Sequence, residues 1–258
     1  YSAGDGVYVG GGWGRVTNCV IHDADYNGGD SAAIRITGPY VQVDHNTIYN
    51  TARDGIRQGG WGAFVLNNTI HDAMLQTTDG GGVYAVRSNG AGSRIAYNRI
   101  YHVHSGGYGA VGIYLDDDSS TYTVDHNLVW DVDHGMKLNN SSIGHQIYNN
   151  TLDASIFSIA SNQAGPWTGT MLANNILFSP VQLGQNVNAQ ANVFAGTDPR
   201  VINRWAGDYD LAAGSLAIGA GVRIGTETGD TSRGPDIGAL RYGASPFASG
   251  SALGEDAD

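Results

Sequence analysis

Short runs of alternating apolar and polar residues follow one another along the chain, and Gly, Asn and Asp separate them. Examples are Ile34–Ile36, Gly82–Ala85, Ile113–Asp116 and Met136–Asn139. Alternation with a period of two is typical of strands that bury one face. No long stretch keeps the period of an amphipathic helix. The pattern therefore predicts an all-β protein of many short strands joined by tight turns.

A second pattern, Asn followed by any residue and then an apolar residue, recurs between these strands. Its spacing is irregular but stays mostly in the twenties, which favours a solenoid with loops of variable length. Equivalent asparagines in stacked coils would lie about 4.8 Å apart and hydrogen-bond along the stack. We therefore predict a right-handed parallel β-helix of about eight coils, with at least two strands per coil and an asparagine ladder. The pattern begins at Asn18, Asn46, Asn68, Asn98, Asn127, Asn150, Asn175 and Asn192.

Composition excludes several classes of protein. Charged residues make up only 14% of the 258 residues, and 24 acidic residues outnumber 13 basic ones. This balance opposes a nucleic-acid partner, and no apolar run has the roughly 20 residues needed to span a membrane. Cys19 is the only cysteine, so an intrachain disulfide is excluded.

The repeats and two further segments resemble the secreted bacterial right-handed β-helix proteins of the pectate-lyase-like superfamily. Gly112–Ser120 is similar to a segment of many such carbohydrate-active proteins, and the segment from Asp198 to Ala239 is similar to their closing region. The resemblance implies a protein secreted or held at the bacterial cell surface, with a polysaccharide as its partner. The superfamily contains lyases, hydrolases, epimerases, adhesins and tailspikes, so the fold does not select the reaction.

Three regions are expected along the chain. Residues 1–195 are predicted to form the coils, 196–243 a segment that caps the C-terminal end, and 244–258 a flexible tail. Residues 1–15 read as a coil without a helical cap, and an open solenoid end exposes core and strand edges. We therefore expect a longer chain, or a partner that covers the N-terminal end.

One outward column of side chains is predicted to form a binding groove. The position after the first inward residue of each strand carries mostly bases and tyrosines, in a chain whose only lysine is Lys137. A substrate with carboxylate or sulfate groups would suit such a column, although any single member also fits a solvated surface. The predicted substrate-binding residues are Arg35, Arg57, Tyr84, Arg87, Tyr114 and Asn139.

Asp116, Asp117 and Asp118 are the leading catalytic candidates. Glycoside hydrolysis needs two carboxyl groups, and Asp116 and Asp118 would share a face, about 6.5 Å apart, if their strand continues. Asp117 would then orient one of them. Two other interpretations stand beside this one: a polar turn closed by side-chain hydrogen bonds, and a calcium site built from the same three carboxylates. The hydrolase needs no cofactor, so calcium is an optional one.

Lys137 indicates a different reaction. Polysaccharide lyases remove a proton beside a uronate carboxylate, and a lysine can serve as the base. The alternative function is thus a lyase with Lys137 as base, with calcium on the three aspartates as an option. A structural salt bridge is the plainer interpretation of Lys137. A further alternative is a carbohydrate-binding, adhesin or tailspike β-helix without catalysis.

Overall fold

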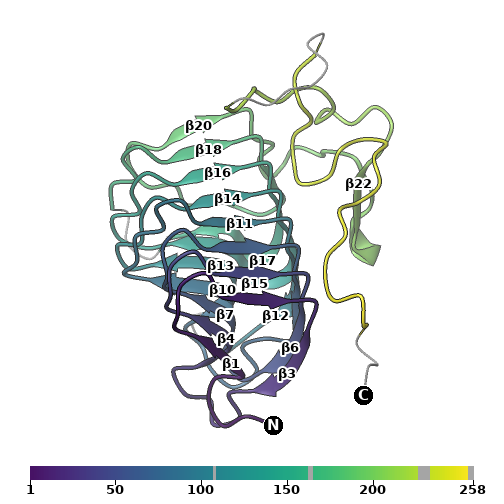
Figure 1. Cartoon of the computed structure of the whole chain (residues 1–258). Coiled ribbons are helices and arrows are strands. Elements are labelled where there is room, and N and C mark those ends of the chain that lie inside the picture. Colours follow the sequence, from purple (N-terminus) through teal and green to yellow (C-terminus); the bar gives the residue numbers. More distant parts are fainter. Residues whose placement is uncertain (107–108, 162–164, 226–232, 255–258) are drawn as a thin grey trace.

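The computed structural model describes residues 1–106, 109–161, 165–225 and 233–254. Its strands stack in coils around a common axis, and the outline of one coil has three faces (Figure 1). Neighbouring coils pair in parallel, with one parallel strand stacked on the next. The fold is therefore the predicted parallel β-helix.

Face 1 and face 3 belong to one sheet of twelve strands. They are continuous because two long strands, β15 and β17, run across both faces. Face 1 contains β1 (Val7–Val9), β4 (Ala32–Ile36), β7 (Asp54–Gln58), β10 (Gly81–Val86), β13 (Val111–Asp116) and the second halves of β15 (Leu128–Leu138) and β17 (Thr151–Ala160). Face 3 contains β3 (Val20–Ala24), β6 (Thr47–Thr51), β9 (Thr69–His71), β12 (Arg99–Val103), the first halves of β15 and β17, and β19 (Ile176–Leu177).

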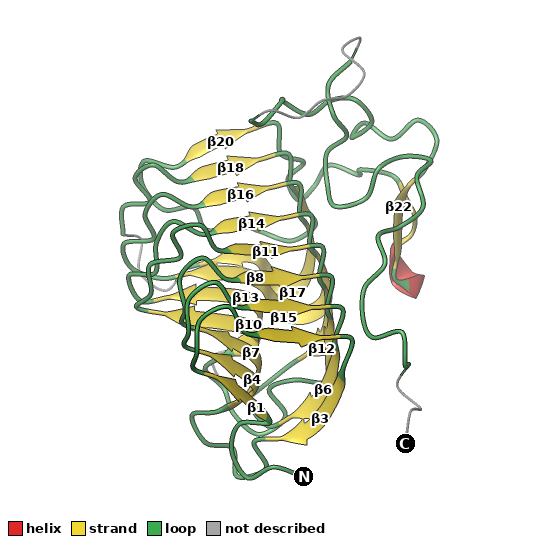
Figure 2. Cartoon of the chain, viewed as in Figure 1, coloured by secondary structure: helices red, strands yellow, loops and turns green. Residues whose placement is uncertain are grey.

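Face 2 is a separate sheet of eight parallel strands, which mark about seven turns of the solenoid (Figure 2). Each strand is only three residues long, and all but β20 point a buried middle residue inward, as Val43 and Ile95 do. Because every coil repeats this pattern, the apolar side chains form one continuous core along the axis. The strands are β2 (Arg15–Thr17), β5 (Gln42–Asp44), β8 (Phe64–Leu66), β11 (Arg94–Ala96), β14 (Thr123–Asp125), β16 (Gln146–Tyr148), β18 (Met171–Ala173) and β20 (Asn188–Gln190).

The asparagine ladder lies at the corner between faces 2 and 3. From Asn46 to Asn192, each side-chain amide donates to the Oδ1 of the next asparagine at 2.9–3.0 Å. The predicted first member is wrong by one residue. The backbone N–H of Cys19 donates to Asn46 Oδ1 at 3.0 Å, so Cys19 holds the ladder position. Asn18 precedes it with a left-handed φ of 54°, like His45 in the next coil.

The C-terminal segment packs along the side of the coils. β21 (Val201–Asn203), the 3-10 helix η1 (Arg204–Ala206) and β22 (Asp208–Leu211) lie against face 3, where Tyr209 packs near Trp130 (Figure 1). This part of residues 196–243 therefore packs along the coils, and a cap formed by the segment stays a prediction. Tyr209, Ala239 and Leu240 of the C-terminal part of the chain are buried against Leu128 on the outer surface of the coils.

The tail is also packed against the coils rather than free. Gly250 donates its backbone N–H to Asn67 O at 2.9 Å, and Ser251 donates to Thr47 Oγ1 at 2.9 Å. Ala252 reaches the first coil and donates to Asn18 Oδ1 at 2.8 Å. The flexible tail predicted for residues 244–258 is thus wrong for residues 247–252, because their backbone groups find partners on the solenoid. Residues 255–258 lie outside the described part of the chain.

Candidate functional site

The predicted outward column exists on face 1. Strand pairing aligns its members one above another, and each follows an inward-facing residue of its strand. The alternation of inward and outward residues seen in the sequence therefore places these side chains on the same outer face of successive coils. From the first coil onward the column reads Tyr8, Arg35, Arg57, Tyr84, Tyr114, Lys137 and Ala160.

Asp116 lies at the centre of a buried polar cluster in this column. Its Oδ2 accepts a hydrogen bond from Tyr84 Oη at 3.0 Å, and its Oδ1 accepts from Asn139 Nδ2 at 2.7 Å. The backbone N–H of Asp117 also donates to Oδ1, at 2.9 Å. We call Tyr84, Tyr114, Asp116, Lys137 and Asn139 the Asp116 cluster; its members are only 2–7% exposed.

Lys137 has an environment that favours its neutral form. Its Nζ lies 4.9 Å from the centre of the Tyr114 ring, and no ion pair to it is recorded among the described residues. Burial lowers the pKa of the Lys137 amine, although the charges of Asp79 and Asp116 act in the opposite direction. Burial also raises the pKa of the Tyr84 and Tyr114 hydroxyls, and the Asp116 carboxylate adds to this effect. The Asp116 carboxylate therefore faces an amine whose pKa is lowered and two phenols whose pKa values are raised.

Arg35 and Arg57 lie in the predicted column, but each is already paired. Arg35 Nε donates to Asp5 Oδ2 at 2.7 Å, and Arg57 forms an ion pair with Asp30. The Arg57 guanidinium also lies over the Tyr84 ring, 5.1 Å from its centre. Both cations are thus partly neutralised within the fold, which weakens their attraction for an anionic chain.

Asp117 and Asp118 leave the column. β13 ends at Asp116, and the next two residues have positive φ angles of 28° and 58° in a turn closed by Ser119 N–H and Asp116 O. Asp118 is exposed, so the condition for a shared Asp116–Asp118 face is not met. The polar-turn interpretation is confirmed at this point.

Arg87 follows β10 in the preceding coil, where its own φ of 46° takes it out of the column. Its side chain is 76% exposed and forms an ion pair with Asp117 at 3.2 Å. Asn140 donates to the other Asp117 oxygen at 2.7 Å. With these oxygens occupied and Asp118 turned outward, the three aspartates do not fit a calcium ion. Within the described residues, no group of three or more His, Cys, Asp or Glu side chains could hold a metal.

Asp54 was missed by sequence reasoning. It is fully buried at the start of β7 and accepts the backbone N–H of Gly81 at 3.0 Å. Burial raises its pKa to about 7, against the attraction of Arg53 and Arg57. The available signal was an acidic residue at an inward position, paired in register with Ala32. Together with Asp30, these groups form a charged network beside Tyr84.

Comparisons with known proteins agree with this architecture. The family described as the right-handed beta helix region matches residues 2–177. A structure of pectate lyase Pel9A is 16% identical, with a TM-score of 0.68 over 91% of this chain and 72% of that chain. A complex of XylC with xylose is 16% identical, with a TM-score of 0.51 over 74% of this chain and 39% of that chain.

These likenesses show the fold. A search of curated protein sequences found no match. Within the described residues there is no helix with the length and apolar character that a membrane crossing requires. Because the family match covers more than half of the sequence and the coils follow its architecture, the chain belongs to the right-handed beta helix family.

Proposed function

We propose that the protein is a secreted polysaccharide lyase that cleaves uronate-containing chains on face 1, with Lys137 as the base. The single observation that carries this proposal is the buried Lys137 amine, whose pKa is lowered by burial and which has no recorded ion pair among the described residues. The similarity of the fold to that of a pectate lyase also supports a lyase reaction.

The reaction is a β-elimination. The neutral Lys137 amine takes the proton from C5 of a uronate, the C5–H electrons form the C4–C5 double bond, and the C4–O bond breaks. The leaving oxygen receives a proton from water. A lowered pKa supplies the neutral amine at a lower pH than a free lysine would. Because Lys137 is 3% exposed, a substrate reaches its amine only when the neighbouring side chains move.

The hydrogen bonds and positions of the two candidate carboxylates, Asp116 and Asp118, favour elimination over hydrolysis. Asp116 already accepts hydrogen bonds at both oxygens, and Asp118 points to solvent from the following turn. A hydrolase needs one carboxyl group as acid and a second as base or nucleophile at a fixed separation. The Asp116 cluster offers one carboxylate and one amine instead. Asp116 is better suited to hold Tyr84 and Asn139 in place.

The test compares wild type with Lys137→Met on polygalacturonate, alginate and neutral xylan. Absorbance near 235 nm reports the new double bond, and reducing ends report any cleavage. We expect absorbance from a uronate polymer, increasing with pH as Lys137 loses its proton, and a loss of about 100-fold or more in the variant. An EDTA series tests the calcium alternative in the same assay.

The matched control is Arg15→Met, which removes an exposed cation on face 2 and is expected to leave activity unchanged. Circular dichroism confirms that each variant is folded. Reducing ends without absorbance, lost in Asp116→Asn, would replace elimination by hydrolysis. No product from any polymer, with folded protein, would leave the binding or structural alternative.

A further inference from the structure

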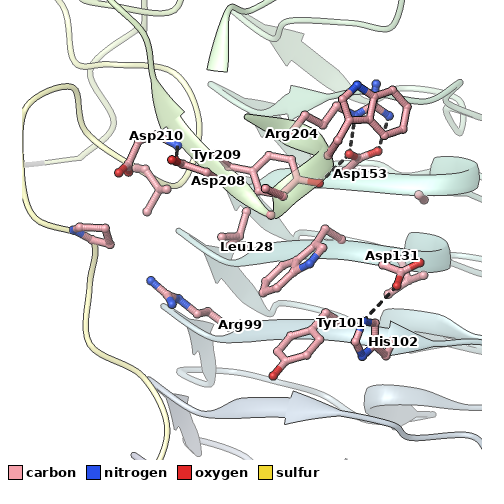
Figure 3. Close-up of a pocket in the computed structure, with 18 of the residues that line it drawn as sticks. Arg99, Tyr101, His102, Leu128, Asp131, Asp153, Arg204, Asp208, Tyr209 and Asp210 are labelled. Carbon is pink, nitrogen blue, oxygen red and sulfur yellow. Dashed lines mark hydrogen bonds and ion pairs between the residues drawn. The ribbon is translucent and has the colours of Figure 1, made fainter. Parts of the chain in front are cut away.

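A cleft of about 940 Å³ lies between face 3 and the C-terminal segment, away from the Asp116 cluster. β12, β15 and β17 form its floor, and η1 and β22 form its outer wall (Figure 3). Arg204 and Trp205 also line an adjoining hollow of about 590 Å³. Both hollows fall within the usual size range of ligand-binding clefts.

A row of stacked rings on face 3 ends at Trp130, in the floor of the cleft. On face 3, His22, Tyr49, His71, Tyr101 and Trp130 stack in successive coils, the last two with centroids 4.5 Å apart. Within this row each ring covers the face of the next. The row stops at Trp130, because the residue in register with it in the next coil is Asp153. Past Trp130, the Tyr209 ring of β22 lies at a tilt of 49°, with its centroid 6.1 Å from that of Trp130.

The outer wall is fixed by a compact polar network. Arg204 donates from Nε and Nη2 to the two oxygens of Asp153, both at 2.5 Å. Tyr209 Oη donates to Asp153 Oδ2 at 2.6 Å. A bidentate pair with a third donor holds η1 in one orientation. Trp205, the middle residue of η1, is left 91% exposed at the rim shared by both hollows.

Polar atoms in the lining are left without partners. Arg99 Nε and Asp210 Oδ1 are buried and make no hydrogen bond within the described structure. Buried polar groups are normally satisfied, so these two atoms gain partners if their side chains turn toward a bound ligand that donates and accepts hydrogen bonds. The lining has four Asp carboxylates and two guanidinium groups. This acidic excess disfavours uronates and other anions.

We propose that this cleft binds a neutral oligosaccharide, separately from the reaction on face 1. Trp205 provides an exposed flat apolar surface for the face of a sugar ring, and Trp130 adds apolar area to the floor. Asp210 and Arg99 take part in hydrogen bonds with sugar hydroxyls. The cleft would hold the protein on a neutral polymer, or on the neutral part of a mixed one. Binding there does not depend on whether the chain is a lyase.

The experiment is calorimetric titration of the whole chain with neutral hexasaccharides: the β-1,4-linked glucose, xylose, mannose and galactose series. The hexamer of galacturonic acid is titrated alongside them. We expect one neutral series to bind at a single site, and binding to weaken about tenfold or more in Trp205→Ala and in Asp210→Ala. Trp205 is exposed, so its replacement leaves the fold intact.

Trp13→Ala is the matched control, because Trp13 is also exposed, at 76%, but lies on a turn of the first coil. It should leave the affinity unchanged, as should Lys137→Met, which separates this proposal from the lyase. The proposal is overturned if no neutral hexasaccharide binds. It is also overturned if Trp205→Ala binds as tightly as wild type, or if only the galacturonate hexamer binds.

Discussion

The pKa values of two aspartates in this protein shift in opposite directions. Burial dominates at Asp54 and raises its pKa to about 7 from 3.8. At Asp133 burial acts in the same sense, but the N–H groups of Ala110 and Ser105 and the His104 ring outweigh it and hold the pKa low. Burial and hydrogen bonding together set the direction. Asp54 is fully buried and accepts one hydrogen bond, whereas Asp133 is only partly buried and accepts three.

Asp54→Asn is predicted to become more stable than wild type as the pH rises. The native state keeps the Asp54 proton between pH 3.8 and about 7, where the unfolded chain has lost it. Wild type therefore loses stability across that window, while the neutral amide does not. The difference in free energy of unfolding should grow by on the order of 2–4 kcal/mol between pH 4 and pH 8. Urea titrations at both pH values measure it.

Asp133→Asn is predicted to change the free energy of unfolding with pH in the opposite direction, in the same urea titrations. Its folded pKa lies below the ordinary value, so the wild-type carboxylate stabilises the fold at neutral pH and this contribution is lost as the pH falls. The variant should be less stable than wild type at pH 8 and approach it in acid. Equal pH profiles for the two variants would contradict the assignment of both groups.

At the scale of elements, the corner between faces 2 and 3 sets the stacking of the coils. Each corner has a left-handed residue followed by a ladder residue, as in Asn67–Asn68. The left-handed residue turns the chain from one face to the next. The ladder residue then binds the corner of the next coil, because Asn98 Oδ1 accepts both the backbone N–H and the Nδ2 of Asn68. Recurrence of this pair explains why coils of unequal length remain in register.

Asn98→Ala is predicted to destabilise the protein by about 3 kcal/mol or more. The change leaves the backbone N–H and side-chain amide of Asn68 without their shared acceptor, and Val65 O without its donor. Buried groups that lose their partners cost more than an exposed hydrogen bond does. Urea unfolding followed by circular dichroism measures the effect. Asn188→Ala, on the exposed strand β20, should stay within about 0.5 kcal/mol of wild type.

At the scale of the whole molecule, the tail joins the two ends of the chain. It leaves the last coils, passes Tyr97 and Arg99 at Phe247, and reaches Asn18 in the first coil. A solenoid otherwise holds each coil only to its neighbours. The tail adds contacts between residues more than 180 positions apart, such as Asn67 and Ala248. It therefore stabilises the N-terminal coils from outside the core.

Gly250→Ala is predicted to release the tail and lower the melting temperature. Gly250 has a φ of +81°, and a Cβ there would lie 2.9 Å from the hydroxyls of Thr47 and Thr69. A shift of roughly 2–4 °C is expected for each kcal/mol lost in a chain of this size. Gly243→Ala separates backbone strain from the clash with the threonines. Gly243 has a similar φ of +71°, but a Cβ there would have no atom within 4 Å. If both variants melt together, the tail contact contributes nothing.

The sequence by itself determined the repeat, the parallel coils and the column on face 1. Alternation fixes which residues of a strand point outward, and recurring asparagines fix how coils stack, so both can be found without coordinates. The column from Arg35 to Lys137 was predicted in this way, and so was its neighbour Asn139. The one-residue error at Asn18 arose because the left-handed position and the ladder position both accept asparagine.

Tertiary structure alone decided which of these residues are buried, paired or available. Asp30 reaches Arg57, and Asp153 meets Arg204 and Tyr209, across separations of 27, 51 and 56 residues. These pairs depend on how loops and the C-terminal segment fold back over the coils, and no local period encodes that. The cleft beside Trp130 exists for the same reason: its two walls come from parts of the chain that only long-range packing brings together.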